Sequence, residues 1–294
     1  MSKIFITMGI FLFLFSSCSL FKKSSKKVEK KVVVKKETKI PVFKIKPGEV
    51  RRLVFNSEDK SARKNHLFCK NKKIPTYYTN GTGVFFLAES YFSSKKPYDC
   101  TVNGKKIIKI SVGSKKFPEE KLKVDKKKIV PPKKTWARIA AEQKMLNKVY
   151  ASSGARPLFK KQFEIPLASK VTSIYGSKRL YNNMKQSQHL GTDYRAKVGV
   201  PIRSTNAGKV VVAQDLYFTG GTVVIDHGLG IFTVYGHLSK VIAAKGEYVP
   251  QNALVGLAGK TGRVTGPHLH WGVKVNGHYI EGDSLVKATI PIEH

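Results

Sequence analysis

Two histidine-containing stretches constrain this chain most, because they combine metal-ligating residue types with the spacing of a β-strand. The first is His189-Leu190-Gly191-Thr192-Asp193 and the second is His268-Leu269-His270, with Tyr235-Gly236-His237-Leu238 between them. Side chains two or four residues apart share a face of an extended strand, so each stretch can present two polar groups to one side. Two imidazoles and a carboxylate suit a three-ligand zinc site with an open fourth position, and further histidines can transfer protons.

The setting of these stretches favours chemistry over a structural role. A single His-x-His on a strand is often structural, and a single His-x-x-x-Asp carries little meaning. Here three such elements fall within one Gly-punctuated region, from about Phe163 to Val286, in which apolar runs alternate with turn residues. We therefore predict a compact antiparallel β domain. Its expected strands include 171–174, 209–213, 222–225, 231–235, 254–257 and 269–275.

A second β-type region lies upstream, over residues 40–113. Short apolar runs are separated there by turn signals such as Asn80-Gly81 and Asn103-Gly104, and the latter predicts a tight hairpin. We expect a small, all-β, sandwich-like accessory domain. The chain has three cysteines, and Cys18 lies outside this region near the N-terminus. The remaining two, Cys69 and Cys100, form an even pair, and in an exported chain we expect a disulfide between them.

The N-terminus predicts export. Residues 4–15 form an apolar run that is too short for a membrane span of about 20 residues but suits a signal peptide. The run ends at Ser16-Ser17-Cys18, which resembles the processing box of a bacterial lipoprotein, so 1–18 is expected to be a signal peptide with lipidation at Cys18. The alternative is an ordinary cleaved signal. Residues 19–39 are Lys-rich and predict a solvated tether, and we expect a lipoprotein that faces the periplasm.

Residues 114–152 predict a Lys- and Pro-rich linker that leads into a helix. Thr135 is expected to cap a helix of about 16 residues, whose apolar positions recur near the helical period. We expect the stripe of Trp136, Ile139 and Leu146 to pack against a neighbouring domain. Residues 153–294 then form the larger β domain.

The charge of the chain limits the classes of partner that we expect it to bind. The formal net charge is +35, and residues 1–150 hold 37 Lys and Arg against 11 Asp and Glu. Such an excess favours a polyanionic surface, although it can simply keep linkers solvated. No helix-turn-helix, RNP-type or zinc-finger spacing accompanies the charge, so we expect no nucleic-acid partner.

The glycine-flanked histidine motifs resemble those of the LytM/lysostaphin-type zinc metalloendopeptidases, peptidase family M23. The resemblance runs from about 163 to 286 and rests on four segments: His189–Asp193, Gly221–Gly228, Tyr235–Ser239 and Gly259–Trp271. It implies one zinc ion held by His189, Asp193 and His270, with catalytic roles for His237 and His268. The sequence does not assign the separate steps to these two histidines. The family fold is a small antiparallel β domain with a long groove.

The same resemblance implies endopeptidase hydrolysis of the peptide cross-links of bacterial peptidoglycan. Asn182 and Asn183 precede His189 in a loop that borders the cleft in the family, so they are candidate substrate contacts. Some relatives have lost metal ligands and activate cell-wall amidases instead, whereas all five expected positions are occupied here. A non-catalytic amidase activator and a peptidoglycan-binding lipoprotein are the alternatives. Which cross-link bond is cut is left open.

Overall fold

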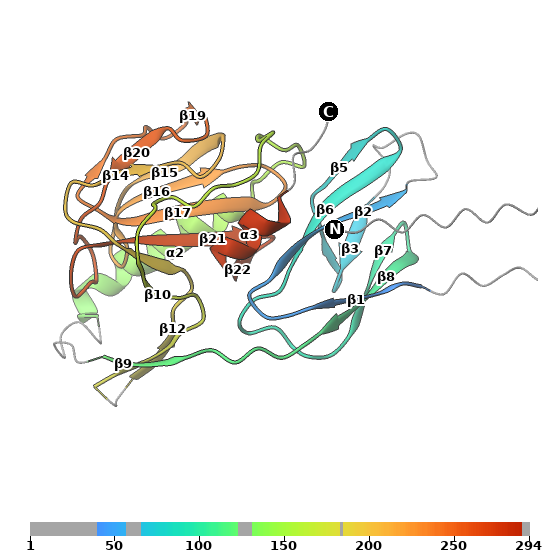
Figure 1. Cartoon of the computed structure of the whole chain (residues 1–294), viewed down its shortest axis with the longest axis horizontal. Coiled ribbons are helices and arrows are strands. Elements are labelled where there is room, and N and C mark those ends of the chain that lie inside the picture. The colour runs from blue at the N-terminus through green and yellow to red at the C-terminus, as the bar shows by residue number, and fades with distance from the viewer. Residues whose placement is uncertain (1–39, 57–65, 123–130, 183–184, 290–294) are drawn as a thin grey trace, which may run out of the picture. The chain divides into compact units, whose positions relative to one another are not determined.

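The computed structural model describes residues 40–56, 66–122, 131–182 and 185–289, which belong to one compact unit, Ile40–His294 (Figure 1). The chain is mainly β with antiparallel sheets, which confirms the predicted fold class. The predicted signal peptide, Cys18 and the tether lie outside the described residues. Within the described part, no helix has the length and apolarity needed to cross a membrane.

The N-terminal β region, residues 40–113, consists of two sheets. Their facing sides enclose a core that includes Leu67, Phe85 and Ile110. The predicted hairpin is confirmed, because Asn103 and Gly104 take the positive φ values of a tight turn (49° and 81°). The five-stranded sheet has the order β1 (Val42–Ile45), β8 (Lys105–Val112), β7 (Tyr98–Val102), β3 (Leu67–Cys69) and β4 (Lys72–Lys73), and the three-stranded sheet the order β2 (Val50–Asn56), β6 (Thr82–Ala88) and β5 (Thr76–Thr79).

The predicted disulfide is present. Cys69 on β3 lies directly opposite Cys100 on β7, and their sulfurs are bonded. Both residues are buried in the core between the two sheets. The bond therefore links neighbouring strands across a sequence separation of 31 residues.

The Cys69→Ser, Cys100→Ser double variant is expected to lose about 3 kcal/mol of unfolding free energy. The physical reason is that the crosslink restricts the unfolded chain, and a loop of this size gains a stabilisation of that order. Urea unfolding of both proteins under non-oxidising and oxidising conditions measures the difference. Equal midpoints for the oxidised wild type and the variant would contradict the expectation.

The second β region is built on an eight-stranded sheet. Seven strands follow one path, with the order β10 (Val171–Ser173), β13 (Thr192–Arg195), β21 (His268–Val275), β17 (Ile231–Leu238), β16 (Gly220–Asp226), β15 (Gly208–Leu216) and β19 (Tyr248–Val249), and β22 (His278–Ile280) pairs with β21. A three-stranded sheet has the order β14 (Pro201–Arg203), β20 (Leu254–Leu257) and β18 (Lys240–Val241), and another has the order β12 (Lys185–Gln188), β11 (Lys178–Tyr181) and β9 (Glu119–Leu122).

The core of this region lies around the central strands of the large sheet. Every residue of β16 and β17 is buried, as their continuous apolar runs require for strands covered on both faces. Tyr235 and Trp271 are among the largest buried side chains, and Val50 and Phe86 of the N-terminal β region join the same core cluster. The short helix α3 (Gly282–Ala288) adds Leu285 to it. The strands that carry the histidines are therefore firmly held.

The predicted helix forms as α2 (Trp136–Tyr150), preceded by a 3-10 turn η2 (Lys133–Thr135), but two details of the prediction are wrong. Thr135 does not cap the helix with its side chain; its hydroxyl donates to the carbonyl oxygen of Pro132 instead (2.7 Å). Trp136 is 55% exposed, so it is not a packing anchor. The C-terminal half packs instead, with Leu146 and Tyr150 among the residues that contact the outer face of β15, β16 and β17.

The segment predicted as a Lys- and Pro-rich linker contains the strand β9. β9 pairs in parallel with β11, so that Glu120 lies opposite Arg179. The strand forms because pairing with a distant strand gives an extended structure to a segment with little strand propensity of its own. The consequence is that an acidic residue from upstream reaches the region of the histidines.

Candidate active site

Two strands joined by a sharp bend bring His189 and Asp193 together. His189 follows the end of β12, the chain bends at Gly191, and Asp193 is the second residue of β13. The segment is thus not one extended strand, and the shared face comes from the bend. Gly191 is required there, because a Cβ atom at this position would lie 2.4 Å from Cε1 of His270.

The other three histidines come from adjacent strands. His268 and His270 project from one face of β21, as their spacing predicts, and His270 is paired in register with Asp193 on β13 and with Gly236 on β17. His237 follows Gly236 on β17 and has a φ of 63°, a left-handed conformation that is costly for a residue other than glycine. A hydrogen bond from its backbone N–H to the carbonyl oxygen of Thr219 (2.6 Å) holds this conformation.

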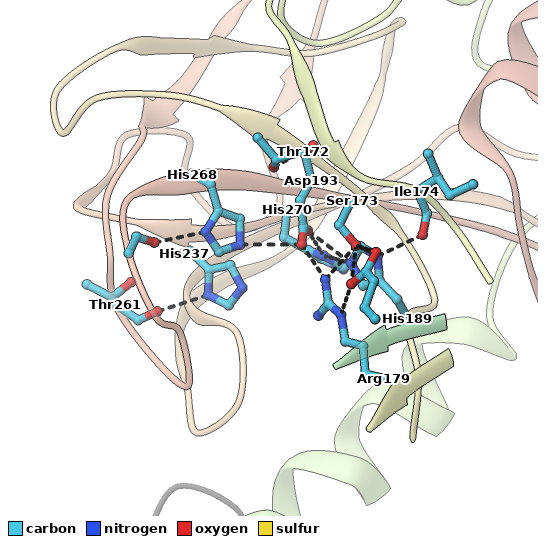
Figure 2. Close-up of polar contacts among 12 residues, drawn as sticks. Thr172, Ser173, Ile174, Arg179, His189, Asp193, His237, Thr261, His268 and His270 are labelled. Atoms are coloured by element: carbon cyan, nitrogen blue, oxygen red, sulfur yellow. Dashed lines mark hydrogen bonds and ion pairs between the residues drawn. The ribbon is translucent and has the colours of Figure 1, made fainter. Parts of the chain in front are cut away.

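Three ligand-type atoms converge at one point, as Figure 2 shows. Oδ1 of Asp193 lies 3.0 Å from Nε2 of His189 and 2.8 Å from Nδ1 of His270, and the two nitrogens are 3.2 Å apart. In a tetrahedral zinc site with bonds of 2.0–2.1 Å, ligand atoms are about 3.3 Å apart. The donor set and its spacing therefore fit a zinc ion with little rearrangement.

Neighbouring groups occupy the remaining polar atoms of His189 and Asp193 and leave the converging atoms available. Nδ1 of His189 lies 3.0 Å from the carbonyl oxygen of Ile174, an acceptor that places the imidazole proton on Nδ1 and the lone pair on Nε2. Nη2 of Arg179 donates to Oδ2 of Asp193 (2.7 Å), so that Oδ1 points into the site. Such partners of the ligands orient them for a metal.

Charge and burial act together on this cluster. Burial alone would raise the pKa of Asp193, but its close contacts with the imidazoles of His189 and His270 reverse this shift, and the pKa lies well below its usual range. Burial lowers the pKa of His189, and its contact with Asp193 opposes this shift. At neutral pH the site therefore presents a carboxylate and a neutral imidazole of His189, the protonation states that metal binding needs.

His237 and His268 lie beside the three converging side chains with their rings 4.7 Å apart. Nδ1 of His237 lies 2.9 Å from the carbonyl oxygen of Thr261, and Nδ1 of His268 lies 2.9 Å from that of Gly266 (Figure 2). These acceptors place the protons on Nδ1 and leave both Nε2 atoms as bases. Burial, followed by the neighbouring His270 and His268, lowers the pKa of His237 to about 3.

The structure therefore brings together the five predicted metal and catalytic residues. Asn182 occupies the turn between β11 and β12 with a φ of 49°. Asn183 lies outside the described residues. The role of both as substrate contacts stays a prediction.

Three residues to which the sequence assigned no role in the site contact the candidate ligands or one another. Arg179 donates to Asp193 and to the hydroxyl of Ser173, and that hydroxyl donates to Glu120 (2.9 Å). Glu119 and Glu120 form an acidic pair within a Lys-rich stretch, which is the one signal in the sequence that set this segment apart. No local pattern relates it to residues 53 or more positions downstream.

Gly191→Ala is expected to weaken metal binding by about tenfold or more while the fold remains intact. The added methyl group would occupy the space of the His270 ring and displace its Nδ1 atom from Oδ1 of Asp193. Changes in the groups around a metal ligand that fix its orientation typically lower metal affinity 10–100-fold. Competition with a zinc-binding dye measures this affinity. Gly154→Ala is the control, because a Cβ atom there meets no atom closer than 4.0 Å, and equal affinities of the two variants would contradict the steric argument.

The fold and the site define a β domain with a His/Asp centre suited to a catalytic metal. Residues 187–281 match Peptidase family M23. The chain therefore contains an M23 peptidase domain, in agreement with the resemblance found in its motifs. In addition, a solved structure from Pseudomonas aeruginosa described as a peptidase M23 is 26% identical, with a TM-score of 0.64, and the alignment covers 83% of this chain and 95% of that one.

Curated relatives share this domain but are much longer. Peptidoglycan DD-endopeptidase ShyA of Vibrio cholerae serotype O1 is 38% identical over 130 residues, which cover 43% of this chain and 30% of that protein. DD-carboxypeptidase/endopeptidase Mpg of Neisseria meningitidis serogroup B is 37% identical over 101 residues, which cover 34% of this chain and 23% of that protein. The chain thus spans less than a third of the length of these relatives.

Proposed function

We propose that this chain is a zinc-dependent endopeptidase that hydrolyses the peptide cross-links of bacterial peptidoglycan. The observation that carries the proposal is the convergence of His189, Asp193 and His270 beside two histidines whose Nδ1 atoms are engaged by backbone carbonyl oxygens. The names of the relatives support cleavage of a bond between a D-amino acid and its neighbour. That support also favours a D-alanyl cross-link over an oligoglycine bridge.

In the proposed mechanism the metal ligands are Nε2 of His189, Oδ1 of Asp193 and Nδ1 of His270. When bound, zinc supplies a Lewis acid that polarises the scissile carbonyl and lowers the pKa of water from 15.7 toward about 7. Arg179 holds Asp193 in place through its other carboxylate oxygen. Nε2 of His237 or His268 accepts the proton of the attacking water, and the imidazolium formed can then donate it to the leaving amine.

Digestion of purified peptidoglycan sacculi tests this function directly. Incubation of the full chain with sacculi that contain direct D-alanyl cross-links should convert cross-linked peptide dimers into monomers, each cleavage giving one new amine. A chelator should stop the reaction and added zinc should restore it. Release that persists in the metal-free protein would contradict the mechanism. No release, together with stimulation of an amidase, would favour the non-catalytic alternative.

We also propose that the chain acts in the cell envelope, held there by lipid on Cys18. The support is the sequence pattern at residues 16–18 and the location of the substrate named for the relatives. In fractionated cells, Cys18→Ser should move the protein out of the membrane fraction. A variant that stays with the membranes would contradict lipid attachment at this cysteine.

A further inference from the structure

A cavity of about 410 Å³ lies away from the candidate metal ligands, and none of its lining residues belongs to that centre. It is formed by four segments that are distant in sequence: β4, the C-terminal half of α2 with the residues after it, the turn before β17, and the end of β21 with the turn that follows it. Its volume falls in the range of about 300–1,000 Å³ that small-molecule sites occupy. Its lining includes Lys72, Lys73, Asn147, Tyr150, Lys274 and Asn276.

The cavity concentrates positive charge. Three lysines line it, and no carboxylate does so among the described residues. The Nζ atom of Lys72 donates to the carbonyl oxygen of Asn276 (2.6 Å), a neutral partner. The Nζ atom of Lys274 lies over two aromatic rings, 4.1 Å from the centroid of Tyr150 and 4.7 Å from that of Tyr279. These contacts position the ammonium groups of Lys72 and Lys274, and neither group is paired with a carboxylate among the described residues.

The buried carboxylate of Glu89 is paired with a lysine that does not line the cavity. Glu89 is fully buried and is engaged by Nζ of Lys70, which lies 2.9 Å and 3.0 Å from its two oxygens. Burial, together with the charge of Lys72, lowers the pKa of Lys274 to about 8. This is the direction expected for an ammonium group that faces another cation without a counter-ion.

We propose that this cavity binds a phosphate ester, with the phosphate held by Lys72, Lys73 and Lys274. Lysines bind phosphate as flexible point charges, and three of them suit a group that carries more than one negative oxygen. Because the cavity is larger than a phosphate ion, the remaining space takes a small polar substituent such as glycerol beside Tyr150 and Asn147. The source is either the headgroup of an anionic phospholipid or a soluble phosphate compound.

Titration calorimetry of the full chain with glycerol 3-phosphate and with inorganic phosphate, at constant ionic strength, tests the proposal. We expect one saturable site for which the ester binds more tightly than the free ion. Lys73→Gln and Lys274→Gln should each weaken binding about tenfold, or about 1.4 kcal/mol, since each removes a charge-assisted hydrogen bond to the phosphate. Lys73→Arg should retain most of the affinity. Lys95→Gln is the matched control, because it removes the same charge from an exposed position outside the cavity.

Vesicle flotation distinguishes the two sources. The wild type and the Lys73→Gln, Lys274→Gln double variant are compared on phosphatidylglycerol and phosphatidylcholine vesicles, so that binding through residues 1–39 is common to both proteins. Weaker retention of the variant on phosphatidylglycerol alone supports a lipid headgroup. Equal retention, with loss of glycerol 3-phosphate binding, supports a soluble ligand. The absence of saturable binding to either phosphate compound, or equal binding by a folded double variant, would overturn the proposal.

Discussion

Replacement of His189 or His270 by alanine is expected to remove zinc from the protein and to reduce cross-link hydrolysis by at least about 100-fold. Each substitution deletes one of three converging atoms, and Asp193 with a single histidine leaves too few ligands for a catalytic zinc site. Changes in the groups that hold the ligands in place already lower metal affinity or activity 10–100-fold. The loss of a ligand itself should therefore have a larger effect. Metal content by mass spectrometry and product analysis on sacculi measure both effects.

The control for this experiment is His66→Ala. His66 is exposed in the N-terminal β region, and the structure records only backbone interactions for it at a distance from the site. This variant should bind one zinc ion per chain and hydrolyse sacculi at the wild-type rate. A His270→Ala protein that keeps stoichiometric zinc would show that the assigned ligand set is wrong. A variant that loses zinc yet remains active would refute the proposed chemistry.

The second large effect is expected from His237→Ala, which should keep its zinc and lose hydrolysis by about 10²–10⁴-fold. His237 is not one of the three candidate metal ligands. Its Nε2 atom is a base, and the hydrogen bond from Nδ1 to the carbonyl oxygen of Thr261 holds the ring in place. A positioned general acid or base contributes rate factors of that size. Zinc content and rates measured on the same preparation separate this outcome from the loss of a ligand.

His268→Ala provides the comparison that separates the two histidines. Nε2 of His268 lies 3.7 Å from Oδ2 of Asp193, so this residue also contacts the carboxylate of the site. If one histidine accepts the proton of water and the other donates to the amine, the two variants should change opposite limbs of the pH–rate profile. Identical profiles with full activity in both variants would show that neither histidine transfers the proton.

Much of the β architecture follows from local sequence patterns. The continuous apolar runs at 222–225 and 231–235 predicted the buried strands β16 and β17, and Asn103-Gly104 predicted its hairpin. The five polar residues of the site were identified by motif, because their chemistry and glycine flanks occur within short stretches. The division of labour between His268 and His270 came from the family resemblance, since strand spacing alone makes them equivalent.

The rest depended on contacts between distant segments. Nothing near Glu120 predicts a strand, because β9 forms only by pairing with β11. Trp136 has the right helical position for packing, but the sheet meets the other end of α2. The bend between His189 and Asp193 depends on close approach of the His270 ring to Gly191, which the spacing of the motif does not reveal.

The parallel pairing of β9 with β11 affects how the catalytic unit can be transplanted. A fragment trimmed to residues 187–281 keeps the three converging residues and the two histidines beside them. It loses Arg179, Ser173 and Glu120, and with them the arginine that fixes the outer oxygen of Asp193. In chimeric enzymes or shuffled domains, the smallest portable unit therefore begins upstream of β9, well before the stretch that defines the family.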